Sequence, residues 1–275
     1  MSAGRFAGVT CLVTGAGGDI GAATARRMAA EGGALVLFDR KEALLAETAE
    51  GCEAAGAAVQ AFGVDQTDRA RVDEAIDAAW ERAGRIDAVF ANAGYGRFSP
   101  FLAIAAEDWH RHVDVNLSGT FHICQSVARR MAEDRGGGSI VVNESSGAVT
   151  HADQLAAYCA TKAGLRMLVT GMASELGTHR IRVNGVMPGV IETGMTAPML
   201  ADERHRDVLL AESPAGRLGS AEDVAALVCF LSSGEAAFIT GESVLIDGGQ
   251  TIHGHPRWFR LDYREAHEER WEIGR

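Results

Sequence analysis

The sequence has no apolar stretch that approaches the roughly 18 residues needed to cross a membrane. Its first residues, Met1 to Phe6, lack the apolar core of a secretory signal. Positive charge is also scarce, because 26 lysines and arginines stand against 37 aspartates and glutamates and leave a formal net charge of −11. Nucleic acids and anionic membranes attract basic surfaces, so we expect neither as a partner. These absences indicate a cytoplasmic protein.

Cysteine pairs with the spacing of redox or metal motifs are missing. The five cysteines are odd in number, widely scattered and without a C-x-x-C pair, which is typical of reduced thiols in a cytosol. The histidines at positions 110 and 112, and those at 253 and 255, are two residues apart. On a helix this spacing points side chains to different faces, so we predict no metal site.

Long linkers and low-complexity tracts are absent as well, and short strand-like runs alternate with alanine-rich amphipathic segments. Seven runs have strand character: Val9–Val13, Ala34–Phe38, Ala58–Phe62, Ile86–Phe90, Ser139–Val142, Ile181–Val186 and Ser243–Ile246. Such alternation implies right-handed crossovers and a parallel sheet covered on both faces. We predict an α/β fold, a Rossmann-type doubly wound seven-stranded parallel sheet with helices on both faces, in one domain over residues 1–254.

A glycine-rich turn follows the first strand-like run. Residues 14–21 read TGAGGDIG and lead into a helical stretch that continues to about Gly32. Glycines let the backbone approach a pyrophosphate, and the helix N-terminus offers free N–H groups and the positive end of a dipole. The residues expected to contact a dinucleotide here are Gly15, Gly17, Gly18, Asp19, Ile20 and Gly21.

The second strand-like run ends in Asp39, eighteen residues past Gly21. A carboxylate at this point can accept hydrogen bonds from the adenosine ribose hydroxyls, and it repels a 2′-phosphate. The neighbouring Arg40 could instead accept that phosphate. The sequence therefore favours NAD and keeps NADP as the alternative.

Tyr158 and Lys162 are four residues apart in a predicted helix. This spacing places both side chains on one face, where an ammonium group can favour the ionised form of a phenol. A phenol normally titrates near pH ~10, and a lowered pKa would make it a usable general acid or base.

Five polar, glycine or proline residues fall at the carboxyl ends of predicted strands. They are Gly15, Asp39, Asn92, Ser145 and Pro188. Ligands of open α/β sheets bind at that edge. The pattern therefore predicts one composite site.

Together these motifs resemble the classical short-chain dehydrogenase/reductase family, from about Val9 to Gly249. The turn is similar to the family's T-G-x-x-x-G-x-G, and the stretch at Asn92, Ala93 and Gly94 resembles its N-N-A-G, with Ala91 replacing the first asparagine. Further matching positions are Asp65 at the adenine, Asn116 in the fourth helix, the nicotinamide-holding segment with Pro188, Gly189, Ile191 and Thr193, and the closing signature at Ile239–Gly241 and Asp247–Gly249.

The resemblance implies an NAD-dependent oxidoreductase that interconverts a secondary alcohol and a ketone. Tyr158 would exchange the hydroxyl proton, and Ser145 would hydrogen-bond the same oxygen. Lys162 would stabilise the tyrosinate and bind the nicotinamide ribose, and Asn116 would hold a water that links Lys162 to solvent. The alternative is a catalytically silent sensor or scaffold with the same fold, since a fold alone does not establish chemistry.

Two adjacent serines compete for the catalytic position. An ungapped alignment between Gly138 and Tyr158 selects Ser145, thirteen residues before the tyrosine, whereas the common Ser-Ser dipeptide would select Ser146. The ungapped alignment is preferred. It places Glu144 where the family usually has a small or uncharged residue, and a carboxylate there needs a partner.

The substrate is the least determined part of the sequence reading. Residues at about 189–216 correspond to the family's substrate lid. The candidate substrate-contacting residues are Tyr95, Arg97, Phe98, His151, Gln154, Met195 and Met199. As a group they suit a ring or carbon chain with polar decoration, and a polyol or an oxo acid also agrees.

Residues 255–275 extend past the point where many family members stop. In helical register Phe259, Tyr263, His267 and Trp271 form an aromatic stripe. We expect a helix that docks on its own or a neighbouring subunit, and the alternative is a tail that reaches a neighbouring active site. The resemblance also implies a homo-oligomer, a tetramer by family analogy.

Overall fold

The computed structural model of the protein describes residues 4–252. Seven strands form one sheet in the order β3-β2-β1-β4-β5-β6-β7, and every neighbouring pair is parallel. The strands are β1 (Thr10–Thr14), β2 (Ala34–Asp39), β3 (Val59–Gly63), β4 (Ala88–Ala91), β5 (Gly138–Asn143), β6 (Ile181–Pro188) and β7 (Ser243–Ile246). The predicted fold class is confirmed, with strand ends displaced by one or two residues.

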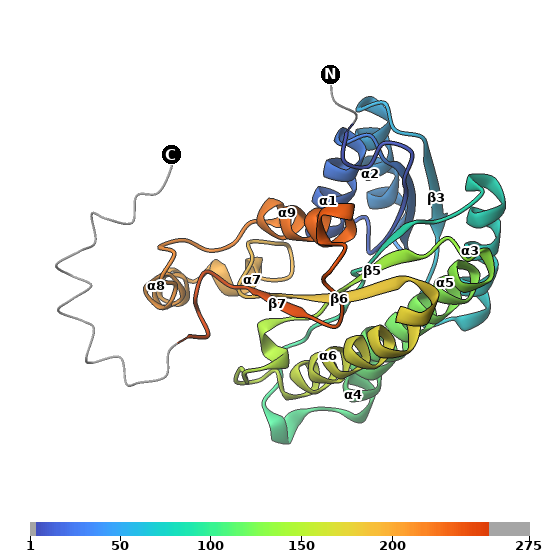
Figure 1. Ribbon diagram of the computed structural model, residues 1–275. Coiled ribbons are helices and arrows are strands. Elements are labelled where there is room, and N and C mark those ends of the chain that lie inside the picture. Colours follow the sequence, from blue (N-terminus) through green and yellow to red (C-terminus); the bar gives the residue numbers. More distant parts are fainter. Residues whose placement is uncertain (1–3, 253–275) are drawn as a thin grey trace.

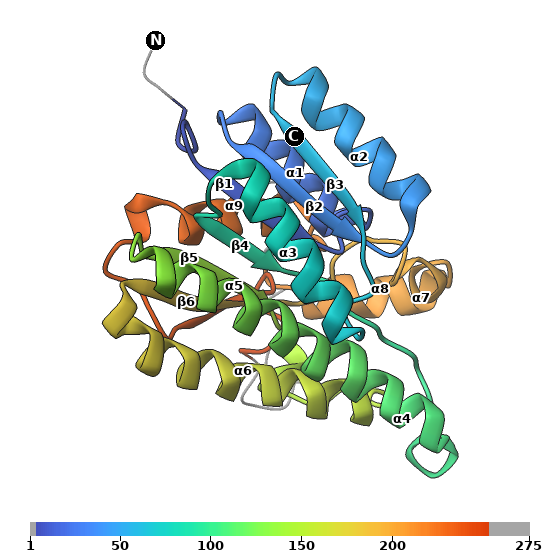
Figure 2. The same ribbon diagram turned by 90° about the vertical axis from the view of Figure 1, so that its right-hand side faces the viewer.

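Helices cover both faces of the sheet (Figures 1 and 2). The α-helices are α1 (Asp19–Ala30), α2 (Glu42–Ala54), α3 (Arg69–Ala83), α4 (Ala106–His112), α5 (Thr120–Asp134), α6 (Ala156–Leu176), α7 (Ala197–Leu200), α8 (Glu203–Glu212) and α9 (Ala221–Ser232). The shorter helices are η1 (Phe101–Ala103), η2 (Val113–Gly119, a π-helix between α4 and α5), η3 (Ser146–Ala148), η4 (Gly177–His179) and η5 (Gly234–Ala236).

Each face of the sheet has its own hydrophobic core. Leu12, Val36 and Val89 pack with α3, α5 and α6 on one face. Their chain neighbours Val13 and Leu37 pack with α1, α2 and α9 on the other face. Both sides of these strands are therefore buried, which explains why they read as continuous apolar runs rather than as alternating patterns.

The chain reverses direction across the sheet between β1 and β4. Strands β2 and β3 lie on one side of β1, and β4 lies on its other side. The loops at the carboxyl ends of β1 and β4 therefore diverge and leave a crevice, which is where ligands of such sheets bind. Figure 1 shows α7 and α8 of the predicted lid beyond this edge.

The predicted C-terminal extension at 255–275 lies outside the described residues, so its helix and its docking stay predictions. Within residues 4–252, none of the helices combines the length and the apolar character needed to cross a bilayer.

A capping box begins α9, the helix that packs against α1. The Ser220 hydroxyl accepts the Asp223 N–H at 3.2 Å, and the Asp223 carboxylate accepts the Ser220 N–H at 2.8 Å. Arg217 donates to both carboxylate oxygens of Asp223, at 2.6 and 2.8 Å, and so lowers the pKa of that carboxyl below its usual range. The stabilising effect of this ion pair is fully present above the ordinary carboxyl pKa. It is lost as the pH falls through the lowered pKa of Asp223.

Ser220→Ala is expected to lower the free energy of unfolding by about 1 kcal/mol, because it removes an N-cap acceptor. In a chain of this size the thermal midpoint should fall by about 2–4 °C. Calorimetry of the variant beside Ser220→Thr, which keeps a hydroxyl, is the matched comparison. Equal midpoints for the two variants would contradict the capping role.

Candidate active site

The glycine turn leaves an open backbone surface at the carboxyl edge of the sheet. Gly15 has φ +62°, a conformation that L side chains rarely adopt. A Cβ at Gly21 would lie 2.1 Å from the Gly15 carbonyl oxygen, so the close packing of turn and helix requires glycine. Asp19, Ile20 and Gly21 begin α1, where the first N–H groups have no intrahelical partner. The turn therefore has the shape and polarity to hold a pyrophosphate.

Asp39 lies directly beside this turn. Its carboxylate accepts the Gly17 N–H at 3.0 Å and the Lys41 N–H at 2.9 Å. The acid at the end of β2 thus braces the glycine turn. Arg40 is exposed next to it.

A row of polar side chains joins the carboxyl ends of three strands. Thr14 on β1 accepts the N–H groups of Asn92 and Ala93 at 3.0 and 3.1 Å. The Asn92 amide donates to the Thr14 carbonyl at 3.0 Å and accepts from the Asn143 amide at 2.8 Å. The Asn143 carbonyl in turn accepts the Lys162 ammonium at 2.6 Å. The cofactor turn and the predicted catalytic lysine are therefore connected by one hydrogen-bonded row.

Tyr158 and Lys162 lie one turn apart on α6, as predicted, with the ammonium nitrogen 5.5 Å from the centroid of the phenol ring. Asn116 is fully buried on η2 and donates to the Thr161 hydroxyl at 3.0 Å. That hydroxyl donates to the Tyr158 carbonyl at 2.7 Å. Asn116 also exchanges hydrogen bonds with the backbone of Tyr95, at 2.7 and 2.9 Å, so it links the loop after β4 to α6.

Of the two candidate serines, Ser145 reaches the phenol. Its side chain is hydrogen-bonded to that of Tyr158, and its hydroxyl also accepts the Gly147 N–H at 3.1 Å. Ser146 instead begins the short helix η3, where its carbonyl accepts the Val149 N–H at 3.0 Å. The geometry therefore agrees with the ungapped alignment.

The expected direction of the Tyr158 pKa shift is wrong for this structure. Burial raises the pKa of the phenol above its ordinary value, and the hydrogen bond from Ser145 offsets this only in part. Burial also lowers the pKa of Lys162 to about 8, against a raising effect of Glu144. Desolvation disfavours the charged form of each group. The spacing of two residues on one helix face carries no information about burial, so the sequence could not predict this effect.

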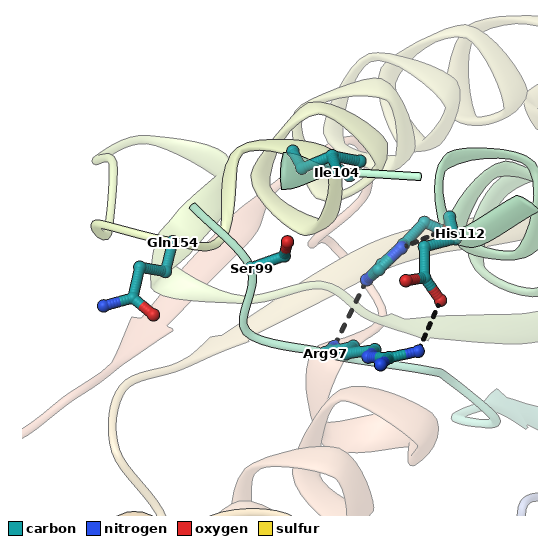
Figure 3. A pocket seen from close by; sticks show the side chains of 7 residues that line it. Arg97, Ser99, Ile104, His112 and Gln154 are labelled. Carbon is teal, nitrogen blue, oxygen red and sulfur yellow. Dashed lines mark hydrogen bonds and ion pairs between the residues drawn. The ribbon is translucent and has the colours of Figure 1, made fainter. Parts of the chain in front are cut away.

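A pocket opens between the loop after β4, α4 and the start of α6 (Figure 3). Arg97 donates to Asp108 at 3.0 Å, and its backbone N–H donates to the His112 ring at 3.3 Å. The Gln154 carbonyl accepts the Ser99 N–H at 2.8 Å, and Gln154 has φ +65°, which is rare for a residue other than glycine. Of the predicted substrate residues, Arg97 and Gln154 line this pocket together.

The remaining predicted substrate residues do not line it. The Tyr95 ring packs on His112 at 4.7 Å and carries Arg111 at 4.5 Å over its face. Phe98, His151 and Met195 are exposed, and Met199 is half-buried on α7. None of these side chains is among those that line the pocket.

The segment after β6 leads into the predicted lid. Pro188 ends β6, the Gly189 N–H donates to the Ile246 carbonyl at 3.1 Å, and Ile191 is buried. Thr193 lies 3.3 Å from the Thr196 hydroxyl. The next residue, Gly194, donates its N–H to the Asp19 carboxylate at 2.8 Å, so the lid is joined to the start of α1.

Several residues that shape the site were missed by the sequence reasoning. Gln66 donates to the carbonyls of Ala93 and Val115 at 3.1 and 2.7 Å, next to the predicted Asp65, which lies in an exposed turn after β3. The other missed residues are Thr14, Ser99, Asp108, His112, Asn143 and Thr161. For Thr14 and Asn143 a signal existed, because each is a polar residue that ends an apolar strand.

Comparison with known proteins agrees with this geometry. A family model described as enoyl-(acyl carrier protein) reductase matches residues 15–251. D-threitol dehydrogenase of Mycolicibacterium smegmatis is 38% identical over 255 residues, which cover 90% of this chain and 95% of the relative.

Two solved structures show the same fold with different dinucleotides. The gluconate 5-dehydrogenase from Burkholderia cenocepacia, in complex with NADP and tartrate, has a TM-score of 0.87 and 36% identity, and the match covers 90% of this chain and 97% of that one. Carveol dehydrogenase from Mycobacterium avium, in complex with NAD, has a TM-score of 0.88 and 28% identity, and the match covers 91% and 100%.

The glycine turn, the strand-end row and the paired tyrosine and lysine thus occur in a chain that matches these proteins over nearly all of its length. The protein belongs to the classical short-chain dehydrogenase/reductase family.

Proposed function

We propose that this protein is an NAD-dependent oxidoreductase that interconverts a secondary alcohol and a ketone, with Tyr158 as general acid and base. The observation that carries the proposal is the contact of Ser145 with Tyr158 beside Lys162, at the edge of the sheet that also holds the glycine turn. A silent sensor would have no need of this arrangement. The relatives described above are also named as dehydrogenases, so the enzyme is the favoured function.

The residues present fit a dinucleotide. The turn at Gly15 to Gly21 would hold the pyrophosphate, Asp39 the adenosine ribose, and the segment from Pro188 to Thr193 the nicotinamide end. The nicotinamide, when bound, supplies or accepts the hydride. We infer a preference for NAD because the Asp39 carboxylate, held by Gly17 and Lys41, would repel a 2′-phosphate.

The chain's own residues would donate and accept the proton that accompanies hydride transfer. With its pKa raised by burial, Tyr158 keeps its proton at neutral pH and can donate it to a carbonyl oxygen during reduction. In the opposite direction, rising pH favours the phenolate that accepts the hydroxyl proton. Ser145 would donate a hydrogen bond to the same oxygen, where negative charge develops.

The pocket beside Tyr158 has a mixed, mainly polar lining and a cavity volume of about 10 Å³, which is room for about one water molecule. Arg97, Ser99, Asp108, His112 and Gln154 give it donors and acceptors, and Ile104 and Ala157 provide the apolar surface. This lining favours a polar group of the substrate at this point, such as a hydroxyl or carboxylate of a polyol or a hydroxy acid.

Tyr158→Phe is expected to lower turnover by roughly 10²–10⁴-fold, the usual contribution of a positioned acid or base. Alcohol oxidation is followed as NADH formation at mildly alkaline pH across polyols, hydroxy acids, cyclic alcohols and steroids. Binding of NADH, measured by fluorescence, should stay near that of the wild type. Ser145→Ala should also lose turnover, whereas Ser146→Ala should retain it. Full turnover in Tyr158→Phe would refute the proposed role of this residue.

Asp39→Asn tests the cofactor preference, because asparagine keeps an acceptor for the Gly17 N–H but removes the charge. The ratio of kcat/KM with NAD to kcat/KM with NADP should fall by about tenfold or more, since juxtaposed like charges cost several kcal/mol. Arg40→Ala is the companion variant. A wild type that prefers NADP and loses that preference in Arg40→Ala would show that the arginine, not the acid, sets the specificity.

We also infer a homo-oligomer, and a tetramer by family analogy. Support comes from large apolar side chains that stay exposed in the described chain, including Leu102 at 99%, Phe101 at 75% and Met167 at 71%. Phe101 and Leu102 are adjacent in the chain, and a contiguous exposed apolar patch commonly marks an interface. Light scattering should give a mass of about four chains for the wild type, and Leu102→Asp with Phe101→Ser should lower it. A monomeric wild type would refute the inference.

A further inference from the structure

Glu144 is a buried carboxylate directly before Ser145. Its side chain is 2% exposed, and one of its oxygens accepts the Ser243 hydroxyl at 2.8 Å. Within residues 4–252, no group donates a hydrogen bond to the other oxygen. Burying a carboxylate with one donor is costly unless a charge compensates it. The residue therefore calls for a partner beyond Ser243.

The neighbouring strands are built to admit this carboxylate. A Cβ at Gly185 on β6 would lie 2.0 Å from Oε1 of Glu144, so a side chain there would displace the acid. Glycine in a strand interior often marks such a close approach. Together with the Ser243 hydroxyl on β7, Gly185 forms a fitted space for Glu144 at the end of β5.

Glu144 lies on the face of the sheet that α6 covers, two residues after Val142 of the core on that face. Among the described residues no direct ion pair reaches its carboxylate, and the positive charges that act on it over a longer distance lie on α6. Lys162 and Arg166 are one turn apart, and both lower the pKa of Glu144, which burial raises to about 7. Lys162 is 3% exposed and is held by the carbonyl of Asn143, the residue just before Glu144. Glu144 is in turn the charged group that raises the pKa of this ammonium against the effect of burial.

We propose that Glu144 is a positioning residue that keeps the buried Lys162 ammonium protonated and thereby sets the alkaline limit of the Tyr158 chemistry. The inference rests on the proposed function for its catalytic consequence, but the coupling of the two charges can be measured without it. The carboxylate opposes the effect of burial on the lysine, and the serine and glycine on the adjacent strands hold it in place.

Glu144 and Lys162 titrate close to one another, so the effect of Glu144 on Lys162 depends on pH. Above about pH 7 Glu144 is ionised and favours the proton on Lys162, whose pKa is about 8. Below that pH Glu144 is neutral, but Lys162 is then protonated in any case because the pH lies under its own pKa. Removal of the Glu144 charge should therefore lower the protonated fraction of Lys162 above pH 7 and have little effect on it below pH 7.

The direct test uses the fact that Lys41 and Lys162 are the two lysines of the chain. Protein labelled with ¹³Cε-lysine gives two NMR signals, which Lys41→Arg assigns. In Glu144→Gln, glutamine keeps the oxygen that accepts from Ser243 and removes only the charge. The pKa of Lys162 should fall by about one pH unit, within the usual effect of a nearby opposite charge. An unchanged pKa would overturn the proposal.

The pH profile of ketone reduction provides the second readout. The alkaline fall of kcat/KM should move to lower pH by the same amount in Glu144→Gln, while the two proteins should agree within about twofold below pH 7. A fall of kcat/KM in Glu144→Gln that is uniform across the pH range would indicate that Glu144 has a merely structural role. It would also overturn the proposal.

Matched variants separate charge from packing. Glu144→Asp restores the carboxylate and should return the Lys162 pKa toward the wild-type value. Glu175→Gln removes a charge from the exposed end of α6 and should leave it unchanged. Ser243→Ala, which removes a hydrogen bond that lowers the pKa of Glu144, should shift Lys162 in the same direction as Glu144→Gln and serves if that variant fails to fold.

The two proposals fail in different ways. Turnover in Tyr158→Phe at the wild-type rate would refute the proposed function and leave the coupling of Lys162 to Glu144 standing. An inactive Tyr158→Phe, with the same Lys162 pKa in wild type and Glu144→Gln, would refute only the role of Glu144.

Discussion

The hydrogen-bonded row from Thr14 through Asn92 and Asn143 to Lys162 holds the rest of the site in register. Its members end β1, follow β4, end β5 and lie on α6, so each link ties one strand end to the next element. Strand ends of a parallel sheet expose carbonyls that no neighbouring helix satisfies, and side-chain amides supply the missing donors. The glycine turn and the helix that carries Tyr158 are thereby fixed against one another.

Helix α6 sets the geometry on the other side of the crevice. Its inner face carries Tyr158, Thr161 and Lys162, and Thr161 is the point where Asn116 attaches the loop after β4. Asn116 lies in the π-helical stretch η2, and π-helical turns often occur at functional sites. Tyr158 and Lys162 therefore stand on regular structure, whereas the pocket beside them is lined largely by the connections around it.

The sequence was sufficient for features that depend on local order. Apolar runs located the strands, and the glycine turn located the start of α1. Counting back from Tyr158 also selected Ser145, the serine whose side chain is hydrogen-bonded to the phenol, and its catalytic role stays a prediction. Features that depend on how helices and loops pack against one another could not be predicted from the sequence. The contribution of Asp108 and His112 to the pocket depends on how α4 lies against the loop after β4, which no motif encodes. The predicted direction of the Tyr158 pKa shift was wrong, because burial is a property of the packed site and not of the local sequence.

Burial has opposing consequences for a catalytic lysine. Enclosure of Lys162 fixes its ammonium against the Asn143 carbonyl, but the same enclosure disfavours its positive charge. A lone buried carboxylate such as Glu144 has the converse problem, since enclosure disfavours its negative charge. Near the same strand end, each group reduces the cost of burying the other, and Gly185 supplies the space that the carboxylate occupies. A glutamate that looks out of place in the sequence is thus explained by the lysine that the mechanism requires.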